Sequence, residues 1–203
     1  MSPSDYGVTN CERVYDGRVV SLRRDTVRMS DGSLAVREVI EHPGAVGIVA
    51  LDEDGSVLLV NQYRHPIAER LDELPAGLLD VDGEPAWAAA RRELAEEAGV
   101  LADEWHVLLD LHTSPGMSDE AIRIYLARGL SDVAEDERFA PEDEEITMTV
   151  TRVPLSEAIR RAQTGQLTNA AAVAGVLAAA CGAESGWTAL RPPDAPWPAR
   201  PGR

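Results

Sequence analysis

Lysine is missing from this chain of 203 residues, and all 19 of its basic residues are arginines. Its absence excludes every chemistry that requires an ε-amine, including Schiff bases, pyridoxal phosphate attachment and the P-loop lysine. Codon bias is the simplest origin of the absence, and the exclusion holds whatever the origin.

Cysteine is almost as scarce, and Cys11 and Cys181 lie far apart. Neither has a partner at metal or redox spacing, and two cysteines do not make a disulfide framework. The first ten residues lack the basic and apolar regions of a signal peptide. The longest run of small apolar residues, 170–182, is too short and too rich in alanine to span a bilayer. We therefore expect a cytoplasmic protein.

Positive charge is in the minority, because 35 acidic residues outnumber 19 basic ones and give a net charge of −16. A surface this negative repels nucleic-acid phosphates and anionic membranes, so we expect neither as a partner. It also repels a phosphorylated small molecule unless a cation intervenes. The length fits one domain with a modest extension, and the hydrophobic content of 44% is enough for a sizeable core.

Residues 12–41 alternate between apolar and polar side chains on both sides of a turn at residues 30–32, which predicts two antiparallel strands in a small N-terminal sheet. Two nearly continuous apolar runs, 45–52 and 56–64, predict a second and more deeply buried hairpin. We divide the chain into an N-terminal hairpin region (1–42), a main domain (43–185) and a proline-rich tail (186–203). The tail either wraps the surface or is loose.

The main domain mixes strands and helices without strict alternation, which favours an α+β fold or a mixed-sheet sandwich. The sequence predicts a helix over 85–98 that ends at Gly99. The other predicted elements are strands over 104–112, 121–130 and about 146–153, and helices over 155–165 and 169–182.

The stretch "RRELAEEAG", residues 91–99, holds three glutamates on that first helix. At 100° per residue, Glu93 and Glu97 share one face and Glu96 lies about 60° to the side. Most glutamate-rich helical faces are simply solvated. Here a Gly-Pro loop leads into the helix, and further acids follow in residues 142–145. Converging carboxylates without His or Cys are typical of a site for Mg²⁺ or Mn²⁺, and such a cation would let an acidic pocket accept phosphate.

Residues 77–100 resemble the Nudix box. Seven positions match that motif in register: Arg92, Glu93, Leu94, Glu96, Glu97, Gly99 and Val100. Glu84 lies the required distance before Arg92. One departure is that six residues, rather than five, separate Gly77 from Glu84. The "ELPAG" before the box, "QYR" at 62–64, Pro115 and the loop "SPGMSDE" are similar to the ADP-ribose pyrophosphatase branch of that family, so the resemblance covers about residues 10–180.

The resemblance implies an α/β/α sandwich around a mixed sheet, with the small antiparallel sheet in front. It also implies metal-dependent hydrolysis of ADP-ribose to AMP and ribose 5-phosphate. Two alternatives stay open. In the first, the substrate is another nucleoside diphosphate derivative, such as a nucleotide sugar or a dinucleoside polyphosphate. In the second, the domain is a non-catalytic ligand-sensing module. The full set of Glu93, Glu96 and Glu97 favours a working hydrolase.

The resemblance also implies roles for individual residues. Glu93, Glu97 and Glu96 would bind Mg²⁺ or Mn²⁺ together with the carbonyl oxygen of Ala76, and Arg92 would orient the glutamates, although its spacing equally fits a surface ion pair with Glu96.

A base must take the proton of the attacking water, and Glu144 or Glu145 occupies the matching position. We favour Glu145, because it adjoins the next predicted strand. Arg37, Arg64 and Glu120 match substrate-contacting positions. The alternatives are that Glu120 only begins a strand and that each arginine is an ordinary cation on a strand surface. The branch dimerises through its N-terminal sheet, and a two-stranded start cannot bury its apolar side alone, so we expect a homodimer.

Overall fold

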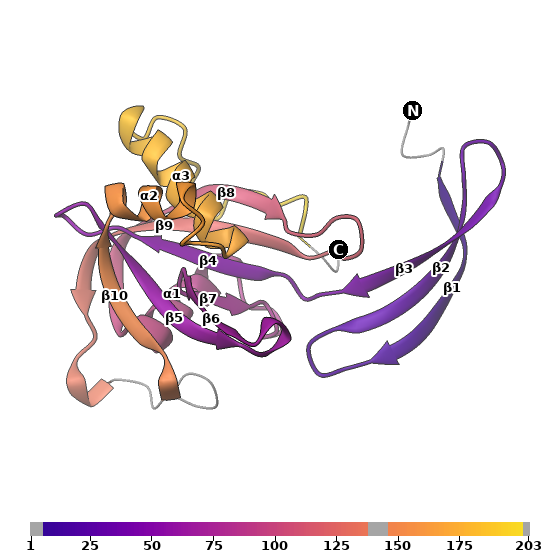
Figure 1. The fold of residues 1–203 in the computed structure, drawn as a ribbon, viewed down its shortest axis with the longest axis horizontal. Helices are drawn as coiled ribbons and strands as arrows, with labels where there is room; N and C mark the ends of the chain where they lie inside the picture. Colours follow the sequence, from indigo (N-terminus) through magenta and orange to yellow (C-terminus); the bar gives the residue numbers. More distant parts are fainter. Residues whose placement is uncertain (1–5, 138–145, 201–203) are drawn as a thin grey trace.

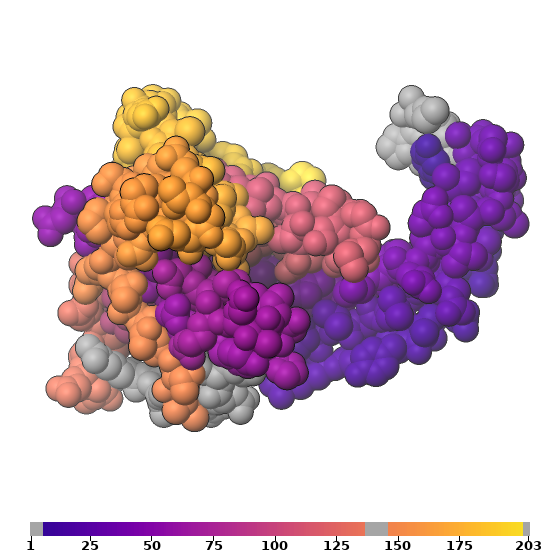
Figure 2. All heavy atoms as spheres, viewed as in Figure 1, coloured from indigo at the N-terminus to yellow at the C-terminus, as the bar shows by residue number. Residues whose placement is uncertain are grey.

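The computed structural model describes residues 6–137 and 146–200. A small sheet stands off a larger body that contains the remaining strands and all three α-helices (Figures 1 and 2). The predicted base, Glu144 or Glu145, lies outside the described residues. None of the helices in the described ranges combines the length and apolar character needed to cross a membrane.

The N-terminal sheet has three antiparallel strands, β1 (Gly7–Asp16), β2 (Ser21–Arg28) and β3 (Leu34–Glu41), in that order. The two predicted strands correspond to β2 and β3, whereas β1 was not predicted. Its pairing with β2 shifts register between Val8 and Asn10 and again between Arg13 and Tyr15. Such bulges interrupt the alternation on which the sequence reading depends.

The body contains two sheets. A four-stranded sheet has the order β7-β4-β9-β8, with β4 parallel to β9 and the other pairs antiparallel. A three-stranded antiparallel sheet has the order β10-β5-β6. The strands are β4 (Ala45–Ala50), β5 (Ser56–Arg64), β6 (Glu69–Glu73), β7 (Ala76–Leu78), β8 (Val100–His112), β9 (Ala121–Asp132) and β10 (Thr149–Pro154).

The predicted hairpin over 45–64 is wrong beyond its turn. The turn forms, since the amides of Gly55 and Ser56 donate to the Asp52 carbonyl and side chain at 3.1 and 2.7 Å. The two strands then enter different sheets and are joined only by the bridge Leu51–Val57 among the described pairings. Both strands are buried, and each obtains its hydrogen-bond partners elsewhere: β4 pairs with β7 and β9, and β5 pairs with β6 and β10.

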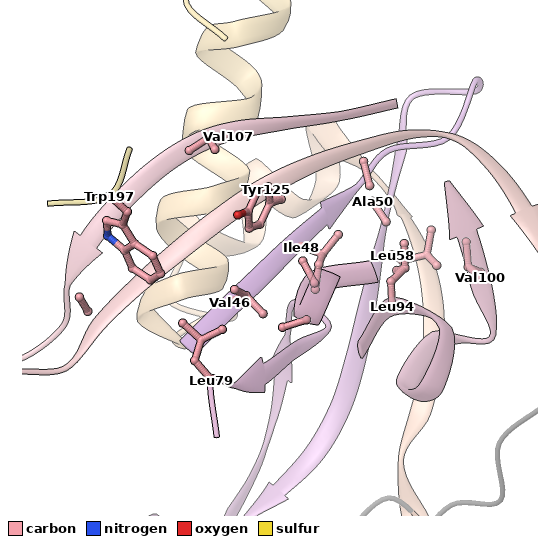
Figure 3. Close-up of a cluster of buried hydrophobic side chains, with 14 residues drawn as sticks. Val46, Ile48, Ala50, Leu58, Leu79, Leu94, Val100, Val107, Tyr125 and Trp197 are labelled. Atoms are coloured by element: carbon pink, nitrogen blue, oxygen red, sulfur yellow. The ribbon is translucent and has the colours of Figure 1, made fainter. Parts of the chain in front are cut away.

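Helix α1 (Ala86–Ala98) packs on one face of the four-stranded sheet and α3 (Ala170–Glu184) packs on the other, while α2 (Leu155–Gln163) lies beside α3 against β5 and β10. Alternation along β4 and β9 divides the core accordingly. Val46 and Ile48 pack with Leu94 of α1 (Figure 3), whereas Val49 packs with Val176 of α3. The predicted α/β/α sandwich around a mixed sheet is confirmed.

The C-terminal segment after Gly186 packs along β8. Val107 and Arg191 exchange two backbone hydrogen bonds of 2.9 and 3.4 Å. Trp197 is 3% exposed and belongs to the α1 side of the core (Figure 3). The guanidinium of Arg123, on β9, lies 4.8 Å from the Trp197 ring centroid and donates to the Ala195 carbonyl at 2.6 Å. The segment wraps the body and contributes a side chain to its interior.

Candidate active site

Helix α1 presents its glutamates to β7 because its other face is fixed against the sheet. Ala89, Ala90 and Leu94 are fully buried, and Gly99 ends the helix with a left-handed φ of 63° while its amide bonds to the Ala95 carbonyl. The additional residue between Gly77 and Glu84 lies in the loop between β7 and α1, outside both elements. The helical part of the motif therefore keeps its spacing.

Arg92 holds three carboxylates. Its Nη1 donates to Glu93 at 2.7 Å and to Glu96 at 2.9 Å. Its Nε and Nη2 donate to both oxygens of Glu84 at 3.2 and 3.1 Å. The Glu84 bonds, with the neighbouring charges, raise the pKa of Arg92 above its usual value. Arg92 thus contacts Glu84, Glu93 and Glu96 at once, and the longer loop does not prevent Glu84 from reaching it.

Glu93 packs directly against the backbone of Gly77. A Cβ atom at position 77 would lie 2.0 Å from Glu93 Cδ. Gly77 does not have a positive φ, so the glycine is needed for space and not for backbone conformation. Burial raises the pKa of Glu93, and the adjacent Arg92 opposes that rise.

Glu97 accepts a hydrogen bond of 2.8 Å from the Ala76 amide. The two predicted principal ligands, Glu93 and Glu97, therefore contact consecutive residues of β7. Ala76 was predicted to contribute its carbonyl oxygen, and the contact in this structure is made by its N–H. The four predicted metal-binding positions lie at one junction between β7 and α1.

Among the described residues, no group of three His, Cys, Asp or Glu side chains is assembled as a metal site. Arg92 lies between Glu93 and Glu96, and Glu97 is directed to a backbone amide. The donors at this junction are carboxylate and carbonyl oxygens, the ligands that hard divalent cations prefer. Their chemistry fits such a cation.

A pocket of about 480 Å³ opens beside this junction. The residues that line it include His42, Arg64, Glu73, Ala76, Thr113 and Glu120. Arg64 donates to both oxygens of Glu73 at 2.9 and 2.7 Å, and Glu73 is only 3% exposed. A bidentate partner fixes the plane of a guanidinium, so Arg64 is held as an oriented cation on the pocket wall.

The opposite charge in the pocket belongs to Glu120. Its carboxylate accepts a hydrogen bond from the Thr113 hydroxyl, and its amide donates to Ser118 Oγ at 3.1 Å. His42 Nε2 lies 3.7 Å from Glu120 Oε1. The structure thus brings Arg64, Glu120 and Ala76 to one pocket.

Arg37 lies elsewhere. It lines a second depression, with Pro115, Met117 and Ala199, and its Nη1 donates to the Val36 carbonyl at 2.9 Å. It shares no pocket wall with Arg64 among the described pockets.

Sequence reasoning assigned no role to Glu73, His42 or Thr113. Glu73 opens the "ELPAG" stretch, and an acid directly before this motif was an available signal. His42 carries no local signal, because its partner Glu120 lies far along the chain. Thr113 opens the loop 113–120 that ends in Glu120, so that loop was an available signal.

Comparison with known proteins agrees with this architecture. The NUDIX domain family matches residues 41–174. An ADP-ribose pyrophosphatase from Mycobacterium tuberculosis is 47% identical over 99% of this chain and 95% of its own length. A methanol dehydrogenase activator from Bacillus methanolicus is 38% identical over 73% of this chain and 78% of its own.

A crystal structure of an ADP compounds hydrolase has the same fold, with a TM-score of 0.75 and 22% identity over 90% of this chain and 97% of that one. The family match spans more than half of the chain, and it includes the junction of β7 with α1. The chain is a member of the Nudix family.

Proposed function

We propose that this protein is a pyrophosphohydrolase that cleaves ADP-ribose to AMP and ribose 5-phosphate with Mg²⁺ or Mn²⁺. The observation that carries the proposal is the junction of the Nudix glutamates with a pocket that holds an oriented cation, Arg64, and a carboxylate, Glu120. Support comes from the full-length relative named as an ADP-ribose pyrophosphatase.

Glu93, Glu96, Glu97 and the Ala76 carbonyl would hold the metal. When bound, the ion supplies charge neutralisation at the diphosphate and a more acidic water. Arg92 keeps the glutamates oriented through its contacts with Glu93 and Glu96.

The substrate is oriented by the pocket wall. Arg64, fixed by Glu73, is placed to bind a phosphate oxygen. Glu145, or its neighbour Glu144, is our proposed base for the attacking water, on the motif resemblance alone. Arg37 remains a proposed substrate contact, at the second depression.

We also propose a homodimer formed through the N-terminal sheet. The register places Tyr15, Leu34 and Val36 on one face of that sheet, where they are 60%, 63% and 56% exposed. A sheet with large apolar side chains on an open face gains stability by covering them. Sedimentation as a monomer at micromolar concentration would contradict this assembly.

A cytoplasmic location is the remaining part of the proposal. Cys11 and Cys181 are both free and exposed, which suits a reducing compartment.

The direct test is hydrolysis of a panel of nucleoside diphosphate derivatives with Mg²⁺ or Mn²⁺, with a chelator as control. We expect ADP-ribose to give the highest kcat/KM, and Glu97→Gln to lower it by at least about a hundredfold. The matched control is Glu184→Gln, an exposed glutamate at the end of α3. Unchanged turnover in Glu97→Gln would refute the metal assignment.

If another compound of the panel has a higher kcat/KM than ADP-ribose, that compound becomes the proposed substrate. If no member of the panel is hydrolysed, a ligand-sensing module becomes the better interpretation. One relative, named as a methanol dehydrogenase activator, carries a name that does not describe a hydrolase.

A further inference from the structure

Glu120 and Arg64 are held in the same pocket by chemically different partners. Arg64 is paired with a carboxylate, Glu73, so its charge is compensated. Glu120 accepts a hydrogen bond from the Thr113 hydroxyl and faces the imidazole of His42. No arginine is paired with Glu120 among the described ion pairs, so no guanidinium occupies its carboxylate oxygens on the side of the pocket.

The orientation of His42 is fixed on its other side. The Gly44 amide donates to His42 Nδ1 at 3.1 Å. An N–H donor at this nitrogen requires a lone pair there, so the ring proton of the neutral imidazole is on Nε2. That nitrogen is the atom 3.7 Å from Glu120 Oε1, a distance longer than a hydrogen bond but short enough for electrostatic attraction. The ring is 12% exposed.

Backbone contacts hold the same two segments together. Ile40 donates to the Met117 carbonyl at 2.8 Å and accepts from the Asp119 amide at 3.1 Å. The His42 amide donates to the Asp119 carboxylate at 2.9 Å. The end of β3 and the segment before Glu120 therefore form one unit, and the position of the His42 ring relative to Glu120 is built into it.

We propose that His42 and Thr113 are positioning residues that aim the Glu120 carboxylate at the adjacent hydroxyls of the substrate's sugar. An ionised carboxylate offers about four acceptor sites. Thr113 occupies one, His42 faces another, and the remainder are free for two neighbouring hydroxyl donors. The pocket thereby distinguishes the two ends of a sugar phosphate, with Arg64 for the phosphate and Glu120 for the diol. This inference rests on the proposed function.

Two pairs of variants separate positioning from general structural support. Thr113→Val removes the hydroxyl and Thr113→Ser retains it. His42→Asn keeps an acceptor for the Gly44 amide but has no group facing Glu120. His42→Gln keeps an N–H where Nε2 lies but loses the Gly44 contact. Each variant is compared with wild type on ADP-ribose and on ADP esterified to a simple alkyl alcohol, after its thermal melting curve has been recorded.

We expect Thr113→Val and His42→Asn to raise the KM for ADP-ribose about tenfold while kcat and the alkyl ester are little affected, because about one hydrogen bond's contribution is lost. Thr113→Ser and His42→Gln should lie close to wild type. Equal losses on both substrates, no loss on either, or a His42→Asn variant better than His42→Gln would overturn the inference.

Calorimetric titration with ribose 5-phosphate supplies a readout independent of turnover. If wild type hydrolyses neither ester, the proposed function fails, and this titration still decides the inference. About tenfold weaker binding by Thr113→Val would support it. Equal binding by wild type and Thr113→Val, or no binding by wild type, would overturn it.

Discussion

Two regions flank the Nudix match at residues 41–174, and they behave in opposite ways. The N-terminal sheet stands off the body (Figure 2), and several of its large apolar side chains are exposed. The C-terminal segment inserts Trp197 into the core and places its carbonyls against the buried Arg123. Position outside the family match thus says nothing about whether a segment is part of the folding unit.

The difference lies in where each region finds its partners. Asp110 accepts from Arg123 at 2.7 Å and from Arg191 at 2.9 Å, so the C-terminal segment satisfies its charges within the chain. In the N-terminal sheet, Asp25 is the only buried residue of the three described strands. Among the described residues, nothing covers the sheet's open face, and this is the observation on which the proposed dimer rests. Four predictions test that contrast.

The largest effect should come from Trp197→Ala. Deleting a fully buried aromatic side chain costs about 3–5 kcal/mol of unfolding free energy, so we expect the midpoint in a denaturant titration to fall sharply. The counterpart on the exposed sheet is Tyr15→Ala, which should change the monomer's stability by less than about 0.5 kcal/mol. Equal effects of the two substitutions would break the comparison.

Asp110→Asn should rank second. It removes the charge that Arg123 and Arg191 share, and hydrogen bonds to charged groups contribute about 1.5–3 kcal/mol. The control is Glu12→Gln, whose ion pair with Arg24 is solvent-exposed and should contribute at most about 1 kcal/mol. Chemical denaturation of both variants at neutral pH gives the two values. If Asp110→Asn is as stable as wild type, the tail is not held by this pair.

A third prediction concerns the exposed sheet. Leu34→Ser combined with Val36→Ser should leave the free energy of monomer unfolding within about 0.5 kcal/mol and abolish the proposed dimer. Sedimentation velocity reports the assembly, and denaturation at low protein concentration reports the stability. A dimer that survives both substitutions would place the interface elsewhere.

The smallest effect concerns pH. Burial alone would raise the pKa of Asp110, but the hydrogen bonds from Arg123 and Arg191 outweigh it and hold the pKa below its usual value. The unfolded carboxyl titrates near about 3.9. The ion pair therefore contributes fully above that pH, and its contribution is lost as the pH falls through the lower, folded value. The stability difference between wild type and Asp110→Asn should stay constant from pH 7 to 5 and shrink below about pH 4.

Much of the site could be predicted because it lies on one helix. A period of 3.6 residues fixes which side chains of 86–98 are buried, so the directions of Glu93 and Glu97 follow from the position of Leu94. The Gly99 cap follows from local chemistry in the same way, whereas the α/β/α sandwich was predicted from the family resemblance. The register of Glu84 also follows, since the additional residue is absorbed by the loop.

Other features depend on contacts that local patterns do not encode. Strand β1 is interrupted by bulges, and β4 and β5 enter different sheets because β4 pairs with β9 and β5 with β10, both far along the chain. Trp197 lies in a proline-rich stretch with no periodicity, and its burial depends on Arg123, 74 residues earlier. His42 acquires its significance only from Glu120, which the topology brings beside it.

Gly77 has a consequence for any selection applied to this protein. Alanine is compatible with its backbone, but a methyl group would displace Glu93 from its Cγ outward and break its ion pair with Arg92. Gly77→Ala should therefore still fold, with a melting temperature near that of wild type, since losing a glycine restricts the unfolded chain and partly offsets the lost ion pair. A screen for thermal tolerance would retain this variant, whereas a screen for turnover would discard it, because the space given up belongs to the chemistry and not to the fold.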